Sequence, residues 1–279
     1  MSDRPAGLGE LERILLVVDR VAIALSGGVD SMTLAHVAMS AMPVKPLLFH
    51  ALSSAVPASA TVRVRDHAER WGWSLKCVDA GELDDSRYAS NPLNRCYFCK
   101  SKLYDYIRRE WSGPLFSGTN CDDLSDYRPG LIAAKEHDVR HPFVEAGIDK
   151  AGIRTIATYL GLDDIAGLPA QPCLSSRIET GIPIDSGSLL LIDQIETRLR
   201  EVLGPVDVRC RLRKSGLHVE IDGGMFERLD SAMLREVGGM VQNHGARVGI
   251  AFGGIAPYVR GSAFVGATAY LAQAGEDEG

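Results

Sequence analysis

The sequence predicts an α/β protein with a doubly wound parallel sheet, followed by a second, smaller α+β domain. Short apolar runs alternate with stretches of helical periodicity, which is typical of a parallel sheet covered by helices on both faces. This alternation changes after a Pro-rich stretch. We therefore expect the first domain over residues 1–170 and the second over residues 171–279 of this 279-residue chain.

The first domain is predicted element by element from its apolar pattern. Leu8, Leu11, Leu15 and Val18 recur at helical spacing and predict an opening amphipathic helix. Ligands of a doubly wound sheet bind at the carboxyl ends of its strands, where the polar segments described below are expected. The other elements are expected as strands at 21–25, 46–52, 74–78, 115–117 and near 142–143, and as helices at 31–42, 60–71, 96–111, 129–136 and 149–160, with a polar loop at 81–95.

The second domain begins after the Pro-rich linker at residues 167–172. Its pattern of helices and strands suits a small domain of ferredoxin-like character, and the tail at 275–279 is expected to be disordered. The expected elements are helices at 188–202 and 226–237 and strands at 206–213, 218–222 and 246–252.

Composition limits the possible partners. The net charge of −6 argues against broad nucleic-acid binding, so no tRNA partner is expected, although Arg209, Arg211, Arg213 and Lys214 leave a local basic groove possible. No secretion signal and no membrane-spanning stretch is visible, so we expect a cytoplasmic protein without membrane contact. Structural disulfides are then not expected among the six cysteines, and clustered cysteines point to catalysis or metal binding.

The string SGGVDS at residues 26–31 follows an apolar strand and opens a helix. Gly27 and Gly28 allow a tight turn in which backbone N–H groups would point toward a phosphate. The positive end of the helix dipole lies at the same place. Ser26 and Ser31 supply hydroxyls, and Asp30 is expected to hold Mg²⁺ that bridges phosphates. An ordinary glycine turn is the alternative. The string lacks the lysine of a Walker motif and resembles the PP-loop of ATP pyrophosphatases, which implies ATP cleavage between the α- and β-phosphates.

A second polar segment, SGTNCDD, follows the strand at 115–117 and continues to Asp126 and Arg128. Gly118 and Thr119 would face the nucleotide because they follow a strand end. Arg128 would neutralise phosphate charge, and Asp123 or Asp126 would hold metal or orient neighbouring groups. The alternative is a solvated acidic loop with Asp126 as a helix cap.

Cys96 and Cys99 lie three residues apart on a predicted helix and so share a face, where two thiolates can bind a metal or cluster or form a redox pair. Cys173, in PCLSSR, is a third candidate. Cys77, Cys121 and Cys210 have no partners at ligand spacing and are interpreted as small buried or incidental residues.

Five segments together resemble the ATP-dependent sacrificial sulfur transferases of the LarE type, which help to make the nickel-pincer nucleotide of lactate racemase. The resemblance covers most of residues 21–184 and is weaker beyond, where residues 258–262 retain a trace of the family's closing strand. The segments are SGGVDS, NPLNRCYFCK, GTNCDDLSDYRPG, the helix from Asp149 to Leu162, and PCLSSRI with Gly181 after it.

This resemblance implies a homo-oligomeric enzyme that uses ATP and Mg²⁺ to adenylate a carboxylate of a pyridinium mononucleotide and then inserts sulfur. Cys173 would supply the sulfur, with Arg177 beside it for phosphate or carboxylate binding. Members that also carry the other two cysteines resemble iron–sulfur proteins, which implies a 4Fe–4S cluster on Cys96, Cys99 and Cys173 with one open iron. A single sacrificial Cys173 is the alternative.

The resemblance assigns further roles in the second domain. Arg209 and Arg211 would bind the substrate phosphate, and Glu196 and Glu220 would hold a second metal; a solvated charged face is the alternative for these residues. Three other functions stay open: a tRNA thiolase of the PP-loop superfamily, an amide-forming ligase of the NAD synthetase type, and a non-catalytic nucleotide-binding regulator.

Overall fold

The computed structural model describes residues 4–125 and 128–259, and the chain divides into two compact units. The first unit comprises Met1–Glu82 and Asn94–Gln171, and the second comprises Leu83–Leu93 and Pro172–Gly279. The chain therefore leaves the first unit for a short segment, returns to it, and leaves again after Gln171. None of the helices in the two described stretches of chain is long and apolar enough to cross a membrane.

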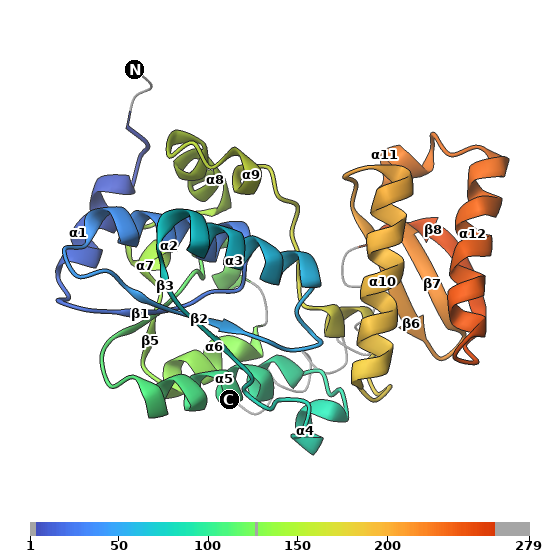
Figure 1. Ribbon diagram of the computed structural model, residues 1–279, viewed down its shortest axis with the longest axis horizontal. Coiled ribbons are helices and arrows are strands. Elements are labelled where there is room, and N and C mark those ends of the chain that lie inside the picture. Colours follow the sequence, from blue (N-terminus) through green and yellow to red (C-terminus); the bar gives the residue numbers. More distant parts are fainter. Residues whose placement is uncertain (1–3, 126–127, 260–279) are drawn as a thin grey trace. The chain divides into compact units, whose positions relative to one another are not determined.

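The first unit is built on a five-stranded parallel sheet in the order β3-β2-β1-β4-β5, which confirms the predicted doubly wound fold (Figure 1). The central strand pairs with both neighbours in parallel, so Ile23 lies between Leu48 and Phe116. Because the central strand β1 is buried on both faces, its side chains must be apolar, which is the pattern from which the strand was predicted. The strands are β1 (Ala22–Ala24), β2 (Leu47–Ala51), β3 (Ser74–Val78), β4 (Leu115–Ser117) and β5 (Val139–Arg140).

Helices cover both faces of this sheet (Figure 1). Leu11, Leu34, Val64 and Ile153 anchor one helical layer in a shared core with the strands. That layer contains α1 (Leu8–Leu16), α2 (Val29–Ala41), α3 (Ala58–Trp71), α8 (Lys150–Tyr159) and α9 (Asp163–Ala166). The opposite face is covered by α5 (Arg95–Glu110) and α6 (Pro129–Glu136), through Leu103, Ile107 and Ala133 among others.

The strand predicted near residues 142–143 is wrong. The fifth strand is β5, at Val139–Arg140, and Pro142 begins the short helix α7 (Pro142–Glu145). Proline suits the first position of a helix because its missing N–H would have no partner there. Phe143 is fully buried, so its apolar signal is real, but a two-residue signal cannot distinguish a strand from a helix turn.

The second unit contains a three-stranded sheet in the order β6-β7-β8, with β6 antiparallel to β7 and β8 parallel to it. The small α+β architecture is confirmed, but the described residues supply three strands rather than the four of a ferredoxin-like unit. Helices α10 and α12 pack against the sheet and contact each other. The elements are α4 (Ser86–Ala89), η2 (Leu174–Arg177), α10 (Ser186–Leu203), β6 (Val208–Arg213), β7 (Gly216–Ile221), α11 (Gly223–Phe226), α12 (Ser231–Ala246) and β8 (Phe252–Pro257).

Two predictions for this unit are wrong. The helix expected at 226–237 is replaced by α11 and the longer α12, because Asp230 accepts hydrogen bonds from the N–H groups of Ala232 and Met233 and starts a new helix. The strand expected at 246–252 begins only at Phe252. Gly245 lies where a Cβ would strike the carbonyl of Ile250, so the end of α12 and the chain that reverses past it approach closely.

The segment at residues 83–93, predicted as a loop, contains the short helix α4 and is fixed within the second unit. Asn91, fully buried with φ +56°, donates its amide hydrogens to the carbonyls of Glu179 at 2.9 Å and Ile182 at 2.8 Å. The Tyr88 hydroxyl lies 2.5 Å from that of Ser175. The predicted tail at 275–279 and the end of the 258–262 segment lie outside the described residues.

Candidate functional site

The SGGVDS string forms the turn between the central strand β1 and helix α2, as predicted. Gly27 has φ +81°, and a Cβ there would lie 2.9 Å from the carbonyl oxygen of Ala60, so only glycine fits. Gly28 is the N-cap of α2, and no side chain caps the first turn. The N–H groups of that turn are therefore available to an anion.

Two hydroxyls line this turn. The Ser31 Oγ accepts a hydrogen bond from the Ser26 N–H at 3.1 Å and donates to the Gly28 carbonyl at 3.2 Å. The Ser26 Oγ lies 3.0 Å from the Ser31 Oγ. From the neighbouring helix α3, Arg63 donates to the Gly27 carbonyl at 2.7 Å and fixes the outer side of the turn. The conformation of the loop is thus fixed by its own hydrogen bonds and by the Arg63 guanidinium group.

Asp30 lies in the first turn of α2, with its carboxylate paired to a lysine. The Lys150 Nζ is 2.7 Å from each carboxylate oxygen, and the Asn120 amide donates to Oδ2 at 3.3 Å. Burial raises the pKa of Asp30, and the Lys150 ammonium opposes that rise. Sequence reasoning did not assign a role to Lys150 or Asn120. The signal for Lys150 was available, since Asp149 is an N-cap that puts the next residue at a helix start.

The second polar segment lies at the end of β4, directly against the loop at residues 26–31. A Cβ on Gly118 would lie 2.7 Å from the Ser31 backbone nitrogen, so the two backbones touch. Ser117 shares a hydrogen bond with Thr119 at 3.2 Å and with the His141 Nδ1 at 2.8 Å. Burial lowers the pKa of His141. The structure therefore brings Gly118 to the loop at residues 26–31 and places His141 beside Ser117 at the end of β4.

Asp123 makes two contacts within this segment. Its carboxylate accepts a hydrogen bond from the Asn120 backbone N–H at 3.1 Å and forms an ion pair with Arg128 at 2.8 Å. These contacts shape the short 3-10 helix η1 (Cys121–Ser125) and hold Asn120 toward Asp30. Asp126, the alternative metal ligand and cap, lies outside the described residues.

Cys96 and Cys99 lie in the first turns of α5, in the first unit, and both are half-buried. The start of α5 packs against the start of α6. A Cβ on Gly130 would lie 3.2 Å from the Lys100 Cγ and 3.7 Å from the Cys96 carbonyl oxygen. Because α6 begins right after the second polar segment, the cysteine pair lies close to that segment within the unit.

Cys173 precedes η2 in the second unit and is half-buried. Arg177, which is 1% exposed, donates to the Glu196 carboxylate at 2.8 and 3.1 Å and to the Cys173 carbonyl at 3.3 Å. Arg177 thus fixes the backbone of Cys173. None of the six cysteines forms a disulfide, and Cys210 is fully buried in β6.

The alternative interpretation of the second-domain charges as a solvated face is wrong. Arg209, Arg211, Glu196 and Glu220 are all buried. Glu220 pairs with Arg211 at 2.9 Å and Arg213 at 2.8 Å, while Glu196 pairs with Arg177 and Arg200. The Arg209 and Arg211 guanidinium groups lie 5.4 and 5.9 Å from the centre of the Tyr258 ring. Burying so many charges together is costly unless they are paired or serve a ligand.

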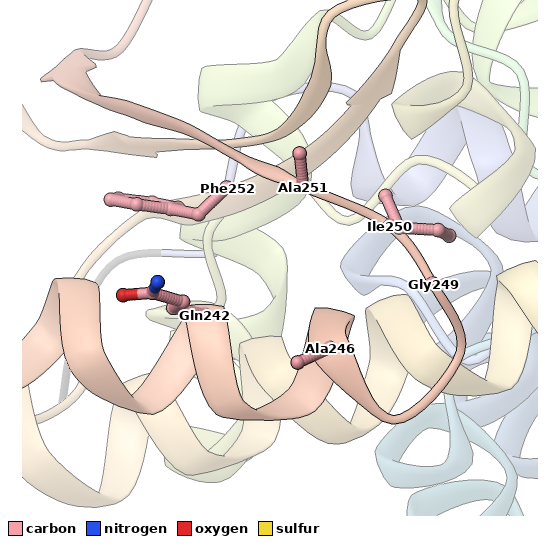
Figure 2. Close-up of a pocket in the computed structure, with 6 residues that line it drawn as sticks. All are labelled: Gln242, Ala246, Gly249, Ile250, Ala251 and Phe252. Atoms are coloured by element: carbon pink, nitrogen blue, oxygen red, sulfur yellow. The ribbon is translucent and has the colours of Figure 1, made fainter.

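Among the described residues, no group of three or more His, Cys, Asp or Glu side chains is placed to hold a metal ion. A surface pocket of about 450 Å³ lies between α12 and the start of β8 (Figure 2). Gln242 is its only polar side chain and no predicted site residue lines it, so we assign it no function.

Comparison with known proteins gives three relatives, and no family model matches the chain. The uncharacterized protein slr1717 of Synechocystis sp. is 35% identical over 248 residues, which is 85% of this chain and 90% of the relative. The uncharacterized protein MJ0830 of Methanocaldococcus jannaschii is 27% identical, over 73% of this chain and 79% of its own. The pyridinium-3,5-bisthiocarboxylic acid mononucleotide synthase of Lactiplantibacillus plantarum is 26% identical, over 73% and 75%.

Proposed function

This chain belongs to the same family as the Synechocystis protein slr1717, and on that premise we propose that it is an ATP-dependent, adenylating sulfur transferase. The named synthase is a more distant relative, and its name describes a mononucleotide that carries two thiocarboxylates. That relationship supports a sulfur-transferase type of function. The proposed substrate here is correspondingly a pyridinium biscarboxylate mononucleotide.

The chemistry explains why such an enzyme needs ATP. To replace a carboxylate oxygen by sulfur, that oxygen must first become part of a good leaving group. In the proposed reaction a substrate carboxylate oxygen attacks the α-phosphorus of ATP, the bond to the β-phosphate oxygen breaks, and pyrophosphate leaves. Sulfur then attacks the acyl carbon and AMP departs with the original oxygen.

The observation that carries this proposal is the arrangement of the loop at residues 26–31. An uncapped helix start, a left-handed glycine and two facing hydroxyls are what a polyphosphate needs. Donors that meet the pyrophosphate as its charge develops would lower the barrier. Asp30, at the same loop, fits a ligand for Mg²⁺, which prefers carboxylate oxygens and would neutralise phosphate charge. Thr119, Asp123 and Arg128 would complete the nucleotide site.

Cys173 is the proposed source of sulfur. Its thiolate would attack the acyl-adenylate, and removal of its Cα proton with cleavage of the Cβ–Sγ bond would release the thiocarboxylate and leave dehydroalanine. Alternatively, Cys96, Cys99 and Cys173 would hold a 4Fe–4S cluster, which would supply sulfide for the transfer. Three thiolates with no histidine at ligand spacing beside either cysteine segment of the sequence favour the cluster over a closed zinc site.

The buried arginines of the second unit support a mononucleotide substrate. Arg209 and Arg211 converge on one aromatic ring, and both would bind the substrate phosphate. In the structure both oxygens of Glu220 and both of Glu196 accept from arginines, and their proposed role in a second metal site would require these pairs to rearrange.

The adenylation proposal is tested by ATP–pyrophosphate exchange. The wild-type protein should catalyse Mg²⁺-dependent exchange when the biscarboxylate mononucleotide is present, and Asp30→Ala should lose it while circular dichroism reports an intact fold. Asp105→Ala, which changes an exposed carboxylate partner of His137, is the matched control and should exchange normally. Unchanged exchange in a folded Asp30→Ala protein would contradict the assignment of the loop.

The sulfur source is tested on protein purified without oxygen. A cluster predicts brown protein with iron and sulfide near a four-to-four ratio, and loss of colour in each of the three single Cys→Ala variants. A colourless protein in which Cys173 alone loses the mass of H₂S after one turnover would establish the sacrificial route instead.

The substrate class is tested with tRNA. We expect no tight tRNA binding at physiological salt, in line with the net charge of −6. Tight binding with a steep salt dependence would instead favour a tRNA thiolase.

A further inference from the structure

Lys150 is bound to the carboxylate that we propose as the magnesium ligand. Its Nζ lies 2.7 Å from both oxygens of Asp30, and the two side chains are 34% and 20% exposed. A lysine that contacts both oxygens occupies the side of the carboxylate that a cation would approach. Lys150 and a metal ion cannot both hold that position.

The backbone of Lys150 is fixed by the second polar segment. Asp149 caps α8 by accepting from the Gly152 N–H at 2.8 Å, and the Lys150 N–H donates to Asp122 at 3.1 Å. The Cys121 N–H donates to the Ile148 carbonyl at 3.1 Å. The same segment carries Asn120, which donates to Asp30. Lys150 is therefore anchored at its backbone, while its four-carbon side chain remains free to redirect the ammonium group.

Electrostatics couples the two partners of this ion pair. A divalent cation placed on Asp30 would lie within a few ångström of the Lys150 ammonium, and the repulsion between them is strong at a partly buried site. Phosphates bound at the start of α2 would give that ammonium a new anionic partner within reach of the same loop. If the metal binds alone, the ion pair between Lys150 and Asp30 is lost without replacement. If metal and phosphate bind together, a contact between Lys150 and phosphate replaces that ion pair.

We propose that Lys150 is a positioning residue that exchanges partners, from the Asp30 carboxylate to the bound phosphates, so that the metal and the nucleotide bind together rather than separately. This inference rests on the proposed function, because it assumes that Asp30 and the loop at residues 26–31 receive metal and phosphate. It adds a residue that makes phosphate a condition for metal binding.

The test measures each ligand alone in the Lys150→Met variant. Mn²⁺ binding without phosphate, followed by electron paramagnetic resonance, should tighten about 10-fold, because Asp30 loses its competing cation. Binding of inorganic pyrophosphate without metal, followed by calorimetry, should weaken about 10-fold, because the phosphates lose a donor. A merely structural role of Lys150 would move both affinities in the same direction. Lys150→Gln serves the same purpose should the methionine variant fail to fold.

Lys76→Met is the matched control, because Lys76 also pairs with a carboxylate, that of Glu110 at 2.9 Å, on the surface. Both affinities should be unchanged in that variant. Wild-type-like Mn²⁺ and pyrophosphate binding in Lys150→Met would overturn the inference and leave the proposed function standing. Wild-type protein that binds no pyrophosphate at all would contradict the proposed function, and the inference with it.

Discussion

Gly118 is the residue at which the second polar segment touches the start of α2. A Cβ there would lie 2.7 Å from the Ser31 nitrogen and 2.9 Å from the Asp30 carbonyl carbon, and both are backbone atoms that cannot swing aside. We predict that Gly118→Ala displaces the phosphate loop and lowers ATP–pyrophosphate exchange about 100-fold. Gly167→Ala, at a glycine with open space around it, should leave exchange unchanged. Normal exchange in Gly118→Ala would show that this contact does not align the loop.

His36 ties α2 to α3 through a buried pair, since its Nε2 lies 2.9 Å from the His67 Nδ1, and His67 in turn contacts Asp164 at 2.8 Å. Burial and the neighbouring His67 lower the pKa of His36 to about 4. The unfolded chain takes up the proton near pH 6.5 and the folded chain only near pH 4, so stability falls as the pH falls between these values. Urea unfolding should lose up to about 2 kcal/mol from pH 7 to pH 5.

The control for this effect is His36→Gln, which cannot titrate. Its free energy of unfolding should be lower at pH 7 than that of the wild type, but it should change less between pH 7 and pH 5. An equally steep pH dependence in both proteins would assign the effect to other groups.

At the scale of single residues, the sequence supplied the motifs of the candidate site but not the pairing of their side chains. Asp30, Ser26 and the glycines could be named as candidates because the pattern of strand, glycine turn and helix start is local. Lys150 and Asn120 lie 120 and 90 residues from Asp30 in the chain. Their contact depends on how α8 and the second segment fold back on α2, which no local pattern encodes.

Between elements, the Arg177–Glu196 pair joins η2 to α10. Both side chains are 1% exposed, and Glu196 also accepts from the Cys210 backbone N–H at 3.0 Å. Burial alone would raise the pKa of Glu196, but the nearby arginines outweigh it and lower that pKa. We predict that Glu196→Leu leaves Arg177 buried without its counter-charge and costs about 3–5 kcal/mol in thermal or urea unfolding.

The comparison for this pair is Glu201→Leu, which removes the partner of Arg198 on the surface of the same helix. Its free energy of unfolding should change by less than about 1 kcal/mol. An equal decrease in the free energy of unfolding in the two variants would show that the buried ion pair contributes no more to stability than the surface pair.

Helices and strands were predictable where the apolar pattern extended over many residues. The predictions were wrong where that pattern was short or where a helix cap set the boundary of the element. The central strands and α2, α5 and α10 carry clear apolar patterns. The start of helix α12 was predicted at the wrong residue, because the Asp230 cap and not the apolar pattern determines where this helix begins. The apolar run at 246–252 was taken for a strand, although Gly249, with φ +74°, turns the chain there and Gly245 lets it pass close to α12.

On the scale of the whole molecule, residues 83–93 fold with the second unit although the chain on both sides of them belongs to the first. Asn91 holds this segment through carbonyls of residues 179 and 182. We predict that Asn91→Asp, which keeps the side-chain shape but removes the donors, destabilises the second unit by on the order of 3 kcal/mol. Hydrogen exchange of β6 and β7 amides would report the loss. Asn94→Asp, at a helix N-cap, should have little effect, and similar losses in both would contradict this role.

The placement of residues 83–93 also imposes an order on synthesis. When the ribosome has made Asn91, its partners at residues 178–182 do not yet exist, and roughly 80 more residues must be added before even Pro172 has been synthesised. At ordinary elongation rates this takes about 4–16 s, long compared with the formation of helices and loops. During that interval the rest of the first unit, residues 94–171, is being synthesised, and residues 83–93 have none of their partners from residue 172 onward. A nascent chain paused there would present Cys96 and Cys99 next to an unanchored segment, the stage at which chaperones would meet it.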